Sequence, residues 1–141
     1  MTAEIFAARG TVEKHIGDAI FAVFGFPSAG RIDAANALLC ADGTLTLSRG
    51  GTANARRQAN RQSRSASGVD TRLAVVVDVG SEYSLSFTVI GDTVDTASRL
   101  QGLTRSLETP LVVVGALVEA IAATSSADSA ALLERLQDQR E

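Results

Sequence analysis

Two short segments carry polar residues that a plain framework of strands and helices does not require. The first is GTVEKHIGD, residues 10–18, in which Asp18 follows a glycine at the tip of an expected hairpin. A carboxylate beside a glycine, which lets the backbone approach closely, is a suitable ligand for a hard cation such as Mg²⁺. A turn aspartate that hydrogen-bonds its own backbone has the same pattern. The spacing alone therefore leaves a metal ligand and a structural turn residue as alternatives for Asp18.

The second segment is GDTVDTASR, residues 91–99, which is expected to lie at the start of a helix. Asp95 and Arg99 are four residues apart, so they share one helix face, away from the apolar stripe. An exposed pair of this kind stabilises a helix by about 0.3–0.5 kcal/mol. An arginine near a helix start is also suited to a phosphate that gains negative charge during a reaction.

The elements that must position these residues follow from the apolar pattern. The run AIFAVF at 19–24 is apolar throughout, which is typical of a central strand buried on both faces. Hairpins mixed with crossover helices favour an α+β fold, in which helices cover one side of an antiparallel-rich sheet. The expected elements are a helix end at 2–9, strands at 11–17 and 19–24, a helix at 32–41, strands at 73–77 and 86–90, a helix at 93–104, a strand from 110 and a helix at 116–123.

The composition is that of an ordinary globular protein and excludes several kinds of site. Of 141 residues, 45% are hydrophobic and 21% are charged, which suits one domain or part of one. Cys40 and His15 are the only residues of their types, which excludes disulfide frameworks, cysteine zinc sites and histidine clusters. We expect Cys40 to lie in the core and the chain to be cytoplasmic. No apolar run approaches the ~20 residues that a membrane span needs.

Charge is unevenly distributed along the chain. The net charge is −3, but residues 44–72 hold six arginines and one acid and carry +5. Residues 43–67 lack periodicity and aromatic side chains, so a nucleic-acid partner for this basic segment is the least favoured hypothesis. We interpret 43–67 either as the product of a reading-frame disruption between Gly43 and Gly68 or as a basic surface loop.

The two chemical segments together resemble the catalytic domain of class III nucleotide cyclases, the adenylate and guanylate cyclases. The sequences GTVEKHIGDAIFAVFG and FTVIGDTVDTASRLQGLTR carry the resemblance, which covers residues 10–42 and 78–124. It implies a ferredoxin-like, palm-type fold, incomplete at both ends, in a partial domain at 1–124 followed by a helical and polar tail at 125–141. It also implies conversion of ATP to 3′,5′-cyclic AMP and pyrophosphate with Mg²⁺ or Mn²⁺, in a homodimer or a heterodimer with another cyclase domain.

The resemblance also implies a role for each matching residue. Asp18 matches one of two metal-binding aspartates. Lys14 and Thr88 match the pair that binds adenine, a base with an acceptor at N1 and a donor at N6. Arg99 matches the arginine that stabilises the pentavalent transition state. Asp95 stands where the family usually has an asparagine that orients the ribose.

Four departures from the family pattern set expectations about activity. The other metal aspartate lies upstream of Gly10 in the family, and the last strands with a triphosphate-contacting lysine lie downstream of this chain. The expected Gly-Ile-Gly-x-x-x-Gly strand keeps one glycine, Gly68. Asp95 adds negative charge near the triphosphate and can pair with Arg99, so we expect it to lower activity. The alternative function is a degenerate, non-catalytic domain that dimerises with an intact cyclase and modulates it.

Overall fold

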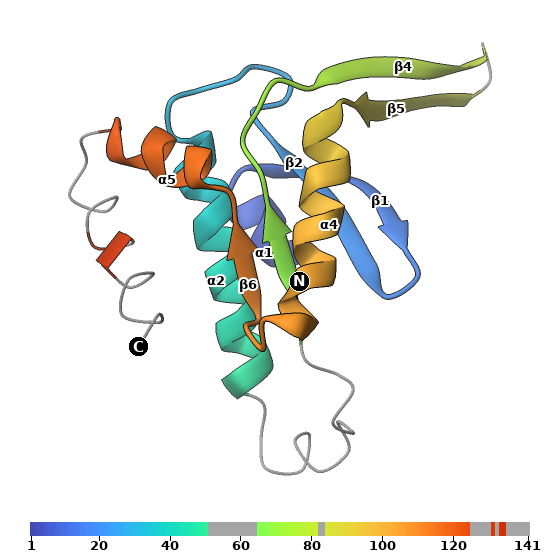
Figure 1. Cartoon of the computed structure of the whole chain (residues 1–141). Helices are drawn as coiled ribbons and strands as arrows, with labels where there is room; N and C mark the ends of the chain where they lie inside the picture. Colours follow the sequence, from blue (N-terminus) through green and yellow to red (C-terminus); the bar gives the residue numbers. More distant parts are fainter. Residues whose placement is uncertain (51–64, 82–83, 125–130, 132, 135–141) are drawn as a thin grey trace.

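The computed structural model describes residues 1–50, 65–81, 84–124, 131, 133 and 134, and its elements are mixed along the chain (Figure 1). Helices are combined with two antiparallel hairpins, and the predicted α+β fold class is confirmed. The elements are α1 (Thr2–Ala7), β1 (Gly10–Ile16), β2 (Ala19–Phe24), α2 (Asp33–Gly50), β3 (Ser67–Val69), β4 (Val75–Ser81), β5 (Ser84–Ile90), α4 (Asp92–Ser106), β6 (Leu111–Val113) and α5 (Gly115–Ala122).

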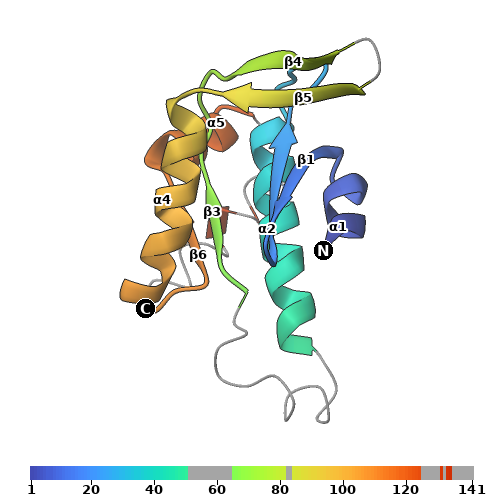
Figure 2. The same cartoon turned by 90° about the vertical axis from the view of Figure 1, so that its right-hand side faces the viewer.

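The strands of the described residues pair into three two-stranded ladders. The pairs β1–β2 and β4–β5 are antiparallel hairpins, whereas β3 and β6 pair in parallel. Strands β3 and β6 lie side by side between α2 and α4, and the β4–β5 hairpin extends away from these helices (Figures 1 and 2). No helix in the described part of the chain combines the length and the apolar character needed to cross a lipid bilayer.

The core lies where α2 meets α5 beside the parallel ladder. Leu38 of α2 and Leu117 and Ile121 of α5 are fully buried. Partly buried side chains from β3 and β6 pack against them: Val69, Leu111 and Val113. Apolar residues three or four apart, such as Ala34 or Ala35 and Leu38 on α2 and Leu117 and Ile121 on α5, therefore face the same pair of strands.

Three details of the expected elements are wrong. Helix α2 ends at Gly50 rather than at residue 41, because the buried residues Leu38, Ala41 and Leu45 continue a helical spacing of three and four past Gly43. Strand β2 is partly exposed along most of its length instead of buried on both faces, because β1 is its only pairing strand among the described residues. The strand expected at 73–77 runs from Val75 to Ser81.

Gly68 sits at the closest approach between the parallel ladder and α4. A Cβ atom at this position would collide with the Ala97 carbonyl oxygen and the Gln101 amide nitrogen, both backbone atoms of α4. Neither atom can move without distorting the helix, so only glycine fits here. The glycine of the expected family motif is therefore required by the packing of β3 on α4.

We predict that Gly68→Ala destabilises the chain by about 1–3 kcal/mol, because the added methyl overpacks a backbone contact. Gly102→Ala is the matched control in α4, since a Cβ there meets no atom within 4 Å. Because alanine favours helix over glycine, the control should unfold at a higher urea concentration than the parent chain. Equal urea midpoints for the two variants would contradict the packing argument.

Candidate active site

The tip of the β1–β2 hairpin presents Asp18 to solvent. Ile16 pairs with Ala19, so Gly17 and Asp18 form a two-residue turn. Gly17 has a φ of 62°, the left-handed conformation that the first central residue of such a turn needs. Asp18 is exposed, and its carboxylate can therefore reach a ligand that approaches from solution.

Lys14 of β1 and Thr88 of β5 converge on one carboxylate, that of Glu13. Lys14 Nζ lies 2.9 Å from Glu13 Oε1, and Thr88 Oγ1 donates a hydrogen bond of 2.9 Å to the same oxygen. The Glu13 side chain is only 2% exposed, whereas that of Lys14 is 48% exposed. The structure thus gathers the two residues expected to contact a purine ring.

Glu13 is a residue that sequence reasoning missed. The register of β1 against β2 shifts between Val12 and Lys14, so Glu13 is the extra residue of a β-bulge. Regular strands send consecutive side chains to opposite faces, and the bulge relaxes this alternation so that Glu13 can contact Lys14. The only sequence signal is an acid between apolar Val12 and a basic residue, which does not identify a bulge.

Asp95 and Arg99 form the ion pair that their spacing predicts. Arg99 Nη2 lies 3.1 Å from Asp95 Oδ2 on α4, and both side chains are largely exposed, 80% for Arg99 and 76% for Asp95. The guanidinium is therefore available to solvent on one side and engaged by a neighbouring carboxylate on the other. An exposed pair of this kind contributes about 0.3–0.5 kcal/mol and is easily displaced by a stronger anion.

The single chain does not bring all the expected site residues together. Among the described residues, no hydrogen bond or ion pair joins Asp18 to Arg99, or either of them to the Lys14–Glu13–Thr88 cluster. They belong to a hairpin turn, to a helix and to a pair of strands, respectively. The described part of the chain also gathers no three acidic, histidine or cysteine side chains in a cluster that could hold a metal ion.

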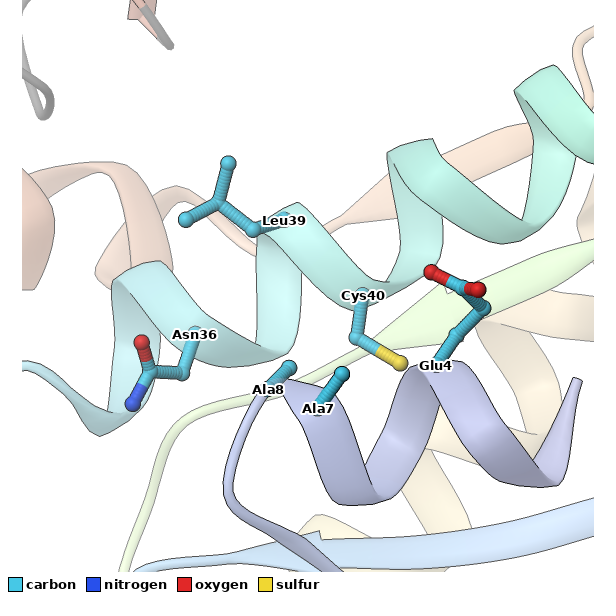
Figure 3. Close-up of a pocket in the computed structure, with 6 residues that line it drawn as sticks. All are labelled: Glu4, Ala7, Ala8, Asn36, Leu39 and Cys40. Carbon is cyan, nitrogen blue, oxygen red and sulfur yellow. The ribbon is translucent and has the colours of Figure 1, made fainter.

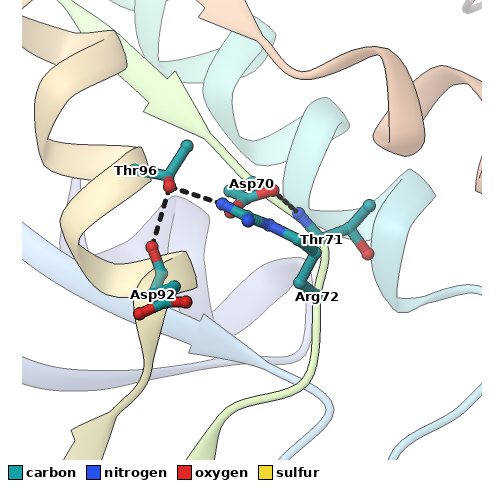
Figure 4. A network of polar contacts seen from close by, with 5 residues as sticks. All are labelled: Asp70, Thr71, Arg72, Asp92 and Thr96. Carbon is teal, nitrogen blue, oxygen red and sulfur yellow. Dashed lines mark hydrogen bonds and ion pairs between the residues drawn. The ribbon is translucent and has the colours of Figure 1, made fainter.

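A second polar cluster joins the end of β3 to the start of α4 (Figure 4). Arg72 donates from Nε and Nη2 to Asp70 Oδ2 at 2.8 and 2.6 Å, and Nη2 also donates to Thr96 Oγ1. The Thr71 amide donates to Asp70 Oδ1 at 2.8 Å. Arg72 belongs to the basic segment 44–72. Its charge is thus paired with Asp70, the acid of the same segment.

The Asp70 carboxyl is fully buried and is stabilised as an anion. Burial by itself raises the pKa of Asp70, but hydrogen bonds from Arg72, Thr93 and the Thr71 amide outweigh it and hold this pKa below its ordinary value. The same contact raises the pKa of Arg72. The cluster has a structural role, because its donors are directed at a buried acid rather than at solvent and connect the loop after β3 to α4.

A hollow lies between α1 and α2 (Figure 3). Cys40 is buried there, as expected of a core residue, and burial raises the pKa of its thiol, which disfavours the nucleophilic thiolate. No residue expected to do chemistry lines the hollow. Its lining residues are Glu4, Ala7, Ala8, Asn36, Leu39 and Cys40.

The chain is similar in sequence and in fold to known adenylate cyclases. Adenylate cyclase 1 of Rhizobium meliloti (strain 1021) is 34% identical over 116 residues, which are 82% of this chain and 17% of that protein. The adenylyl cyclase CyaB from P. aeruginosa superimposes with a TM-score of 0.72 at 23% identity, over 86% of this chain and 63% of that one. The resemblance to class III nucleotide cyclases is confirmed.

Other comparisons define how far this cyclase likeness extends. The guanylyl cyclase Cya2 superimposes with a TM-score of 0.67 at 24% identity, over 84% of this chain and 59% of that one. No model of a protein family matches the chain. The cyclase fold is thus shared with both an adenylyl and a guanylyl cyclase, and the chain spans 17% of the length of its Rhizobium relative.

We predict that Asp70 makes this cyclase-like chain more sensitive to acid. Its pKa is depressed in the folded state, so its stabilising effect is complete above the unfolded pKa of about 4 and is lost as pH falls through the folded pKa. Asp70→Asn should therefore lose less stability than the parent between pH 6 and pH 3 in urea unfolding. Asp78→Asn, at an exposed position of β4, is the control and should follow the parent. An Asp70→Asn curve parallel to the parent's would contradict the argument.

Proposed function

We propose that this chain forms part of a nucleotide cyclase site that converts ATP to 3′,5′-cyclic AMP and pyrophosphate. The main observation behind this proposal is that Lys14 and Thr88 both contact Glu13 Oε1. These residues lie on β1 and β5, and a family resemblance independently pairs them on an adenine ring. The 34% identity to an adenylate cyclase supports the same reaction.

The proposed role of each residue follows from its donors and acceptors. Lys14 would donate to the purine N1, and Thr88 would accept from the 6-amino group. Arg99 would stabilise the charge that develops on the phosphates, because its planar guanidinium can donate to two oxygens at once. Arg99 is 80% exposed, which leaves room for a triphosphate against it.

Asp18 is the residue proposed to hold Mg²⁺ or Mn²⁺. A single exposed carboxylate fits Mg²⁺, which commonly takes one or two protein carboxylates and fills its remaining positions with substrate phosphates and water. When bound, such an ion lowers the pKa of the attacking ribose 3′-hydroxyl and neutralises phosphate charge. The exposed hairpin tip lets Asp18 meet the phosphates without rearranging the core.

The site is proposed to be completed by a second cyclase domain. Within one chain, Asp18 and Arg99 make no contact, although the reaction needs both at one triphosphate. A twofold pairing would bring the hairpin tip of one copy to α4 of the other and create two equivalent sites. The partner would be a second copy or another cyclase domain, and we propose that this assembly works in the cytoplasm.

A second candidate function is favoured by the Asp95–Arg99 contact. Asp95 engages the guanidinium that would otherwise meet the phosphates, and it adds a negative charge beside them. A domain weakened in this way can still pair with an intact cyclase and alter its activity. This chain would then be a modulating partner rather than the catalyst.

We predict that the chain with Mn²⁺, mixed with a complete homologous cyclase domain, yields more cyclic AMP than the two proteins assayed separately. In such a pair one site would take its metal from Asp18 of this chain and the other would use this chain's Arg99, so Asp18→Asn combined with Arg99→Ala should lower this gain about a hundredfold. Glu119→Gln, an exposed change on α5, is the control and should keep the gain. Unchanged output from the mixture after both changes would contradict a catalytic role, and inhibition by the unaltered chain would favour the modulator.

We predict that Asp95→Asn raises turnover in that mixture by about threefold to tenfold. The change removes an ion pair of about 0.3–0.5 kcal/mol and a charge repulsion of about 1 kcal/mol in water. Asp92→Asn, also exposed and three residues earlier on α4, should leave turnover unchanged because Asp92 does not engage Arg99. The measurement is the initial rate of cyclic AMP formation at saturating ATP, and an equal rate in parent and Asp95→Asn would disprove the interpretation.

A further inference from the structure

The carboxylate of Glu13 is buried and, within the described part of the chain, only half of it is hydrogen-bonded, which is unusual for an acid on a β-strand. Its side chain is 2% exposed. Oε1 accepts from both Lys14 and Thr88, while Oε2 has no hydrogen-bond partner among the described residues. A buried carboxylate with one unsatisfied oxygen weakens a fold, so the folding of the chain alone does not account for an acid at this position.

The contact with Glu13 fixes the direction of the Thr88 hydroxyl. A hydroxyl has one proton and two lone pairs, and an ionised carboxylate can only accept. The proton of Thr88 therefore points at Glu13, and lone pairs remain for a ligand. Without Glu13 the hydroxyl could rotate and offer either a donor or an acceptor.

The same oxygen orients Lys14, which can only donate. One ammonium proton is directed at Glu13 Oε1, and the other two remain for a ligand because the side chain is 48% exposed. The rings of Phe26, two residues after β2, and Phe87 of β5 stack with centroids 5.1 Å apart, which links the chain after β2 to the strand that bears Thr88. One carboxylate thus holds a directed donor on β1 and a directed acceptor on β5.

We propose that Glu13 is a positioning residue that sets the purine preference of the site. A donor at Lys14 beside an obligate acceptor at Thr88 complements a 6-aminopurine, which accepts at N1 and donates from its amino group. A 6-oxopurine has a proton on N1 and a lone pair at position 6, so it mismatches both residues. This inference rests on the proposed cyclase function, and it assigns the discrimination to a side chain that need not touch the nucleotide.

The test compares the binding of ATP and GTP to the full chain with Mn²⁺ by isothermal titration calorimetry. Glu13→Met preserves side-chain length but removes the acceptor, and it should reduce the ratio of ATP to GTP affinity about tenfold, the effect of one lost hydrogen-bond preference. Glu13→Gln keeps an acceptor oxygen and should retain most of the ratio. Glu119→Met, at an exposed site on α5, should leave the ratio unchanged.

A coupled variant separates a positioning role from a structural one. In a Thr88→Val background the hydroxyl is gone, so adding Glu13→Met should change the ratio much less than it does in the parent. An equal change in both backgrounds would overturn the proposal, as would an unaltered ratio in Glu13→Met itself. Those two results leave the cyclase function standing, whereas an unaltered chain that binds neither nucleotide overturns both.

Discussion

A single carboxylate oxygen joins the first hairpin of the chain to a strand 75 residues further along. Glu13 Oε1 draws together a lysine on β1 and a threonine on β5, two elements from separate ladders. Hydrogen bonds to a buried charge are stronger than those between neutral groups, and their loss leaves the charge uncompensated. An electrostatic contact therefore links the two hairpins at this point, although Glu13 Oε2 stays without a hydrogen-bond partner among the described residues.

The same principle holds at the second polar cluster. Asp70 is fully buried and receives donors from its own loop, and Arg72 reaches from there to Thr96 on α4. Gly68 lies just before this cluster and brings β3 against the α4 backbone. Close backbone packing and a paired buried acid thus fix α4 on the parallel ladder, and α4 in turn presents Arg99 on its outer face.

The sequence predicted those features that depend on local pattern. Gly17 and Asp18 identify the hairpin, and the four-residue spacing of Asp95 and Arg99 identifies their contact, because turn chemistry and helix periodicity are local. The extent of α2 was not predicted, because residues from 43 onward were interpreted as lacking periodicity, and the burial that carries the helix onward to Leu45 is a tertiary effect. The role of Glu13 was also hidden, because a β-bulge and a partner on a distant strand leave no mark in local spacing.

The three narrow ladders have a consequence for the behaviour of the chain in solution. Each strand of the described residues pairs with one neighbour, so the opposite edge of each carries no backbone ladder. On the β4–β5 hairpin these edges accompany apolar side chains that are more than half exposed, at Val75, Val79 and Ile90. Open edges flanked by valine and isoleucine recruit further strands. At high protein concentration we therefore expect two chains to associate through these strand edges. Many natural sheets prevent such association with a lysine or a proline on the edge strand.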